Sequence, residues 1–221
     1  GGTLGVFIGG RISEKLRNLI TDVLGCVTII SAADALSAYW DKDLQDAMPQ
    51  GWVILVVVFS LLAGAVIGSL LRIEDRLEGI GEVIRKRFAK RQEPGPFISG
   101  FVTATLLFCI GPLTILGAIQ DASGETPQLY IIKGTLDGFM SVIFGAIHGV
   151  GVLFSAVSVF VVQGTLTLFG TQLDSLLNDR MRIELFATGG LAVMAIGLNL
   201  LDIKKIRLGS LLPGLIVTPV L

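Results

Sequence analysis

The sequence predicts an all-α fold, a polytopic transmembrane helical bundle, and three observations lead to that prediction. Of the 221 residues, 52% are hydrophobic and only 16% are charged, whereas soluble domains average about 25% charged residues. The mean hydropathy is +0.78. The charged residues gather in clusters between apolar runs of roughly 17 to 22 residues, the length of a helix that crosses a ~30 Å hydrocarbon layer.

The apolar runs predict about eight spans within a single transmembrane domain, residues 1–221. They cover residues 1–10, 19–38, 52–71, 97–118, 128–147, 150–170, 185–201 and 207–221. The first run is too short to cross a membrane and does not resemble a signal peptide, so we expect a first span that is truncated in this sequence.

The distribution of basic residues orients the predicted spans. Three loops on one side hold 13 of the 17 basic residues, which predicts that these loops face the cytoplasm. They are Arg11, Lys15, Arg17, Arg72, Arg76, Arg85, Lys86, Arg87, Lys90, Arg91, Lys204, Lys205 and Arg207. The opposite loops are acidic and contain Asp41, Asp43, Asp46, Asp121, Glu125, Asp174, Asp179 and Glu184. The charges keep this pattern only if residues 128–170 form two helices with a tight turn at 148–151. Both termini are then outside.

A charged stretch at 72–91 has apolar residues at helical spacing. These are Ile73, Leu77, Ile80, Ile84 and Phe88. The pattern predicts a cytoplasmic amphipathic helix that lies in the membrane interface. It serves either as a topological anchor or as a site for a specific lipid or regulator.

Two G-x-x-x-G pairs, Gly5/Gly9 and Gly64/Gly68, each lead into an Arg-Ile pair or a similar basic amphipathic stretch. Residues 163–177 show a weaker similarity to these two stretches and cross the membrane in the opposite direction in the predicted topology. Inverted repeats of this kind are typical of secondary transporters. The alternative is that glycine-rich membrane helices resemble one another by composition. The pairs themselves predict close helix contacts, within one chain or in a homo-oligomer.

Polar residues inside the predicted spans are candidates for a transport pathway, because polar groups are costly in hydrocarbon. The run at 128–147 is the richest, with Lys133, Asp137 and Ser141 at successive i+4 positions on one helix face. Lys133 either pairs with Asp137 or extends to the membrane surface. Asp137 lies near mid-membrane and is the predicted coordinating or coupling carboxylate.

Two proline-glycine pairs predict interrupted helices. Gly111-Pro112 interrupts the run at 97–118, and Pro213-Gly214 interrupts the last run. Proline removes a backbone donor and frees a carbonyl about four residues earlier, which forms either a simple kink or part of a solute site. The remaining candidates for the pathway are Gln120, Asp121, Asn199 and Gln163.

Other chemistry has little support in the sequence. There is one histidine, His148, and the two cysteines, Cys26 and Cys109, fall inside apolar runs, where they are expected to be small buried hydrophobes. We therefore expect no metal site, no cofactor and no enzymatic activity. The net charge of −1 gives no indication of a nucleic-acid partner.

Several phrases resemble one bacterial family. They are LLFCIGPLTILGAIQD (106–121), KGTLDGF (133–139), GVLFSAVSVFVVQGTLTLFG (151–170), ATGGLAVMAIGLNLLDIKKIRLGSLLP (187–213) and the opening GGTLGVFIGGRISEKL. They are similar to the YdfK/YqgA-type family of bacterial inner-membrane proteins, a domain of unknown function. The resemblance covers nearly the whole chain and implies a multi-pass protein of the bacterial plasma membrane with a presumed transport role. It supplies no substrate and no site residues.

The leading hypothesis is a small secondary transporter or channel for an ion or small polar solute. The alternative is a non-transporting membrane scaffold or lipid-binding protein. Both predict the lipid bilayer as a partner.

Overall fold

The computed structural model describes residues 1–9, 13–40, 42, 52–124 and 126–220. Within these residues it is helical, with no strand. The α-helices are α1 (Gly2–Gly9), α2 (Glu14–Leu36), α4 (Trp52–Leu70), α5 (Ile73–Phe88), α6 (Pro94–Ile110), α7 (Pro112–Ala122), α8 (Gln128–His148), α9 (Gly151–Leu168), α10 (Gly170–Leu176), α11 (Asp179–Leu200) and α12 (Leu212–Val217). Short 3-10 helices are η1 (Ser37–Trp40), η2 (Leu208–Leu211) and η3 (Thr218–Val220). The all-α prediction is confirmed.

The predicted count of eight spans is not confirmed. In the described part of the chain, five helices are long and apolar enough to cross a membrane, or six if the bent pair α6–α7 is one span. They are Glu14–Trp40, Trp52–Leu70, Gln128–His148, Gly151–Leu168 and Asp179–Leu200. The last predicted run forms the apolar helix Leu208–Val220, which is shorter than a full span. It consists of the α-helical segment α12 between two 3-10 segments, η2 and η3.

Two helices begin earlier than predicted because a capping residue precedes each one. The Ser13 hydroxyl accepts a hydrogen bond from the Leu16 amide at 3.4 Å, so α2 begins at Glu14. The Asn178 side chain accepts from the Met181 amide at 2.9 Å, so α11 begins at Asp179. Such caps satisfy amides that the first helical turn leaves unpaired. The charges of Arg180, Arg182 and Glu184 therefore lie on a helix, not in a loop as predicted.

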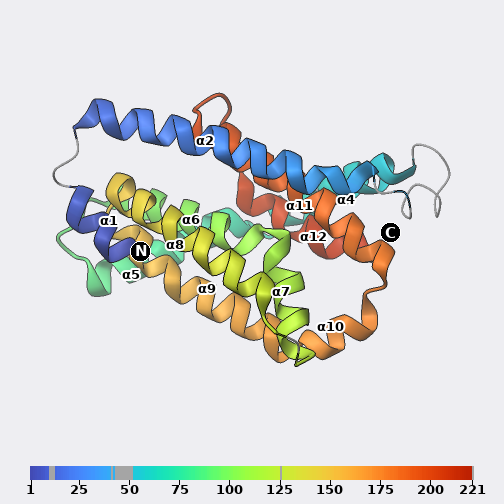
Figure 1. Ribbon diagram of the computed structural model, residues 1–221. Helices are drawn as coiled ribbons and strands as arrows, with labels where there is room; N and C mark the ends of the chain where they lie inside the picture. The colour runs from blue at the N-terminus through green and yellow to red at the C-terminus, as the bar shows by residue number, and fades with distance from the viewer. Residues whose placement is uncertain (10–12, 41, 43–51, 125, 221) are drawn as a thin grey trace.

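The turn predicted at 148–151 is present. Helix α8 ends at His148 and α9 begins at Gly151, and Gly149 between them has φ +74°, a conformation that favours glycine. The two helices thus run antiparallel and lie next to each other (Figure 1). The amphipathic helix predicted at 72–91 is also present, as α5.

Four helix pairs dominate the packing: α2 with α11, α1 with α8, α6 with α9 and α4 with α12. In Figure 1, α2 and α11 lie together along one side of the bundle, and α8 and α9 lie along the other. The largest fully buried side chains include Phe101 on α6, Phe144 on α8 and Ile196 on α11. The core therefore centres on α6, which contacts both α8 and α11.

Both predicted G-x-x-x-G pairs make contacts within the chain. A Cβ atom on Gly5 would lie 2.0 Å from the Val142 carbonyl oxygen of α8, and one on Gly9 would lie 2.4 Å from the Ala146 carbonyl oxygen. Gly64 and Gly68 on α4 approach Gly214 and Ser210 equally closely. These glycines allow helix backbones to touch, as small residues do in membrane bundles.

The outer surface of the long helices is apolar. Large hydrophobic side chains are exposed on α2, α4, α8 and α9, among them Ile30, Leu62, Phe139 and Phe160. A water-soluble protein rarely exposes so many such residues, so this surface is suited to lipid. Cys26 is also exposed on α2, which corrects the expectation that it is buried, whereas Cys109 is partly buried.

The two ends of the bundle differ in charge. Arg207 forms an ion pair with Asp75 at 2.5 Å, which brings the loop before η2 beside α5. Lys15 and Arg17 begin α2 beside the C-terminal ends of α1 and α8, on the same side of the molecule as α5 (Figure 1). We call this the basic end. Arg11 and the predicted acidic positions Asp41, Asp43, Asp46 and Glu125 lie outside the described residues.

Candidate functional site

The helical segment formed by α6 and α7 is interrupted at Gly111, where the chain bends sharply. Gly111 has an extended conformation, with φ −59° and ψ 142°, and the two helices are bent by 55°. Pro112 has no amide hydrogen, so the carbonyl of Phe108, four residues earlier, has no helical donor. An unpaired carbonyl within a membrane bundle costs several kcal/mol by general estimates, roughly 2–7, so another group is required to satisfy it.

Lys133 on α8 satisfies that carbonyl. Its Nζ donates a hydrogen bond to the Phe108 oxygen at 2.8 Å and another to the Asp137 carboxylate. The Thr114 hydroxyl lies 3.4 Å from the same carbonyl oxygen as a second, weaker donor. We call Phe108, Thr114, Lys133 and Asp137 the break site.

The two charges of the break site differ in burial. The Lys133 side chain exposes 7% of its surface and the Asp137 side chain exposes 30%. Lys133 therefore points into the bundle and pairs with Asp137, instead of extending to the membrane surface. Asp137 lies near the middle of the 21-residue α8, where a charge is costly unless it is paired.

Gln120 and Asp121 lie at the other end of α7 from the break. The Gln120 Oε1 accepts a hydrogen bond from the Leu129 amide at 3.0 Å, so it caps the first turn of α8. Asp121 is half-buried on the last turn of α7. These two predicted pathway residues are thus on the elements that form the break site but about two and a half to three helical turns from Gly111.

Asn199 lies at the basic end, far along α11 from the first turn of that helix. Its side chain donates to the Ile206 carbonyl at 2.9 Å and accepts from the Ile206 amide at 2.7 Å. This pair of hydrogen bonds closes the loop between α11 and η2. The structure does not bring Asn199 to Lys133 and gives it a structural role.

We expect Asn199→Ala to destabilise the protein by about 1–3 kcal/mol, because the Ile206 amide and carbonyl both lose their partner. Asn199→Asp should cost less, since its carboxylate still accepts from the amide but no longer donates to the carbonyl. Unfolding by sodium dodecyl sulfate in mixed micelles would measure both values. If Asn199→Ala matched wild type, the loop closure would not contribute to stability.

The remaining predicted residues are distributed over other contacts. Ser141, one turn after Asp137, donates to the Gly138 carbonyl at 2.8 Å and contacts the start of α1. Gln163 is half-buried on α9. Pro213 is buried on α12 against α4. Of the predicted set, Lys133 and Asp137 belong to the break site, which lies at the helix interruption formed by Gly111 and Pro112.

Sequence reasoning missed two polar features. Thr114 belongs to the break site, and its position two residues after a proline gave no signal of that. Glu184 on α11 exposes 1% of its surface and pairs with Arg180 at 2.9 Å. The Asn178-Asp179 start signal could have placed Glu184 on a helix. Within the described residues, no three His, Cys, Asp or Glu side chains are grouped as a metal site requires.

Long apolar helices, an apolar outer surface and a charged pair at a helix break define the protein as a helical membrane protein. It belongs to the family described as "Protein of unknown function (DUF554)", whose model matches residues 1–221. The family predicted from the sequence phrases is thus confirmed.

Two relatives from bacteria are similar over nearly the whole chain. "Uncharacterized membrane protein YdfK" of Bacillus subtilis (strain 168) is 28% identical over 216 residues, covering 98% of this chain and 87% of the relative. "Uncharacterized protein YqgA" of Escherichia coli (strain K12) is 26% identical over 223 residues, covering 98% and 88%. No solved structure matches the protein.

Proposed function

We propose that the protein is a small secondary transporter or channel for an ion or a small polar solute. It crosses the bacterial plasma membrane several times, with the basic end in the cytoplasm, and it is not an enzyme. The observation that carries the proposal is the Lys133–Asp137 pair against the Phe108 carbonyl, which Pro112 leaves without a helical donor.

The hydrogen bond to the Phe108 carbonyl is a structural role of Lys133, but a neutral donor could fill that role without placing two charges near mid-membrane. Two charges near mid-membrane are expensive, and well-packed apolar residues are often as stable as a buried ion pair. Interrupted helices whose free backbone groups and helix ends coordinate ions or anionic substrate groups are typical of solute sites in transporters. The break site combines the interrupted helix, the free carbonyl and the charged pair.

The pair also suggests how a solute would act on the site. With Lys133 bound to Asp137, the two charges cancel. An anion that replaces Asp137 on Lys133, or a cation or proton that binds Asp137, would break the pair and change the interactions of α8 with the end of α6. Occupancy and helix position would then be coupled, which is what a transport cycle requires.

A flux assay in proteoliposomes tests the proposal. Ions and small anions would be screened with wild type and with the double variant Lys133→Gln, Asp137→Asn, which removes both charges but keeps side chains that can hydrogen bond. Asp34→Asn is the matched control, because Asp34 is an exposed carboxylate on α2 without an ion pair in the described part of the chain.

We expect flux of at least one solute through wild type and Asp34→Asn, and loss of that flux in the double variant. Equal flux in all three would remove the break site from the mechanism. No flux of any screened solute through wild type would favour the alternative, a scaffold or lipid-binding protein. The inverted repeat remains a prediction. A transport cycle of this kind would use the two related halves of such a repeat.

A further inference from the structure

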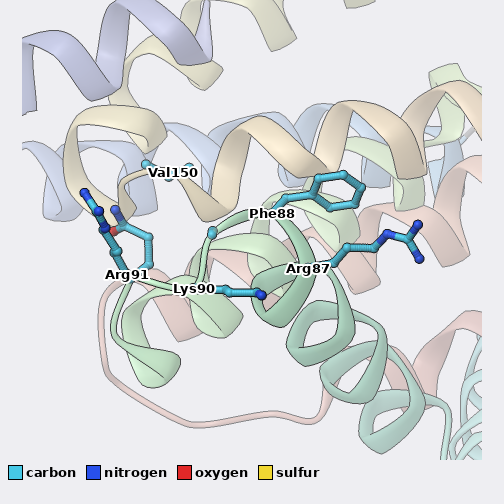
Figure 2. Close-up of a pocket in the computed structure, with 7 residues that line it drawn as sticks. Arg87, Phe88, Lys90, Arg91 and Val150 are labelled. Carbon is cyan, nitrogen blue, oxygen red and sulfur yellow. The ribbon is translucent and has the colours of Figure 1, made fainter.

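A hollow of about 390 Å³ lies at the basic end, between the C-terminal end of α5 and the α8–α9 turn. Its lining residues are Arg87, Phe88, Ala89, Lys90, Arg91, Gln92 and Val150. Figure 2 places Arg91 beside Val150 at one end and Arg87 at the other, with Lys90 between them. The lining thus contains three cations and no acidic side chain.

Within the described residues, these three cations have no ion-pair partner. The neighbouring Arg85 and Lys86 pair with Glu82 at 2.7 and 3.3 Å, and the hydrogen bond from Arg85 lowers the pKa of Glu82 to about 2. In contrast, the described residues include no ion pair to Arg87, Lys90 or Arg91. The hollow therefore has an uncompensated positive charge.

Contacts around the C-terminal end of α5 position the backbone that carries these exposed cations. The Phe88 ring stacks on Phe154 of α9 with 6.0 Å between ring centroids, and the Arg87 guanidinium lies 5.9 Å from the Phe88 centroid. The Gln92 amide donates to the Ala89 carbonyl at 2.9 Å, which forms the turn that presents Lys90 and Arg91.

The same helix has an apolar surface for lipid chains. Val83 exposes 65% of its surface and lies opposite Gly81, which packs against Phe101. Phe88 is on the same face as Gly81 but, at the end of the helix, still exposes 68%. A helix with exposed apolar residues and a basic end lies in the membrane interface. Arginine and lysine side chains there reach to the depth of the lipid phosphates.

We propose that this hollow binds the phosphate headgroup of an anionic glycerophospholipid, independently of any transport activity. Guanidinium groups form paired hydrogen bonds with phosphate oxygens. The C-terminal end of α5 opposes an anion with about half a negative charge, which three cations outweigh. Phe88 and Val150 add apolar walls that suit a lipid better than a free anion.

Lipid binding to the purified protein in an uncharged detergent tests this site. Native mass spectrometry would give apparent Kd values for phosphatidylglycerol and for phosphatidylcholine with the same acyl chains. The site variant is Lys90→Gln with Arg91→Gln, both exposed. The control is Lys204→Gln with Lys205→Gln, two exposed lysines that do not line the hollow.

We expect phosphatidylglycerol to bind wild type and the control alike, and to bind the site variant about 30-fold more weakly, since each basic residue near an anionic lipid contributes roughly a factor of five. Phosphatidylcholine should bind more weakly than phosphatidylglycerol in all cases. The proposal would be overturned if phosphatidylglycerol lost affinity equally for both variants, or lost none for the site variant. It would also be overturned if wild type bound the two lipids equally, or if inorganic phosphate displaced phosphatidylglycerol.

Discussion

Asp137→Asn is expected to destabilise the protein by about 3 kcal/mol, because it leaves the Lys133 ammonium buried without a counter-charge. Removing one partner of a buried ion pair costs roughly 3–5 kcal/mol, and the partial exposure of Asp137 places the effect at the lower end. The Phe108 carbonyl remains as a neutral partner. Unfolding by sodium dodecyl sulfate in mixed micelles would measure the change.

Two further variants make this prediction specific to the pair. Lys133→Met should cost at least as much as Asp137→Asn, since it leaves the partly exposed Asp137 carboxylate unpaired and also removes the donor of the Phe108 carbonyl. Combining Lys133→Met with Asp137→Leu should recover only part of the lost stability, because no buried charge then lacks a partner but the Phe108 carbonyl keeps only the weak donor Thr114. A double variant that loses the sum of the two single effects would show that the two side chains are not coupled.

The sequence allowed prediction of the parts of the break site that depend on local spacing. Lys133 and Asp137 are four residues apart on one helix, so their pairing follows from helix geometry. Because Pro112 has no amide hydrogen, the Phe108 carbonyl four residues earlier is identified as the group without a helical donor. That Lys133 fills this position could not be predicted, because it depends on how α6 packs against α8.

Asn199 and Gln120 show why polarity within an apolar run is a weaker indication of function. Both were predicted as pathway residues because polar groups are costly in hydrocarbon. In the structure each one satisfies backbone groups at a helix end, Ile206 and Leu129 respectively. A polar side chain in an apolar run indicates that a hydrogen bond must form. It does not identify the partner, because a loop or a neighbouring helix supplies that group.

The predicted count of eight spans is not confirmed, for a related reason. Hydropathy measures whether a segment is apolar, but helix length depends on where backbone hydrogen bonds are interrupted. Residues 207–221 are as apolar as a span, yet the α-helical part is only Leu212–Val217. The backbone of α12 also lies directly against the backbone of α4 at Gly64. Hydropathy does not report such close contacts.

Gly64→Ala is expected to destabilise the protein by about 1–3 kcal/mol, because the new methyl group has no space. A Cβ atom at position 64 would lie 2.2 Å from the Gly214 nitrogen and 2.4 Å from its Cα. Both are backbone atoms, so α4 and α12 must move apart, and no side-chain rotation can relieve the clash. The free energy of unfolding in mixed micelles would measure the loss.

Gly164→Ala on α9 is the matched control, since no atom lies within 4 Å of the position its Cβ would occupy. There the same substitution should stabilise the protein by roughly 0.5–1 kcal/mol, because alanine favours the interior of a helix over glycine. Opposite signs at positions 64 and 164 would separate the contact from helix propensity. If both alanines stabilised the protein equally, α4 and α12 would not be in backbone contact, and α12 would have to be held by other interactions, such as the hydrogen bond from Thr218 to Thr188.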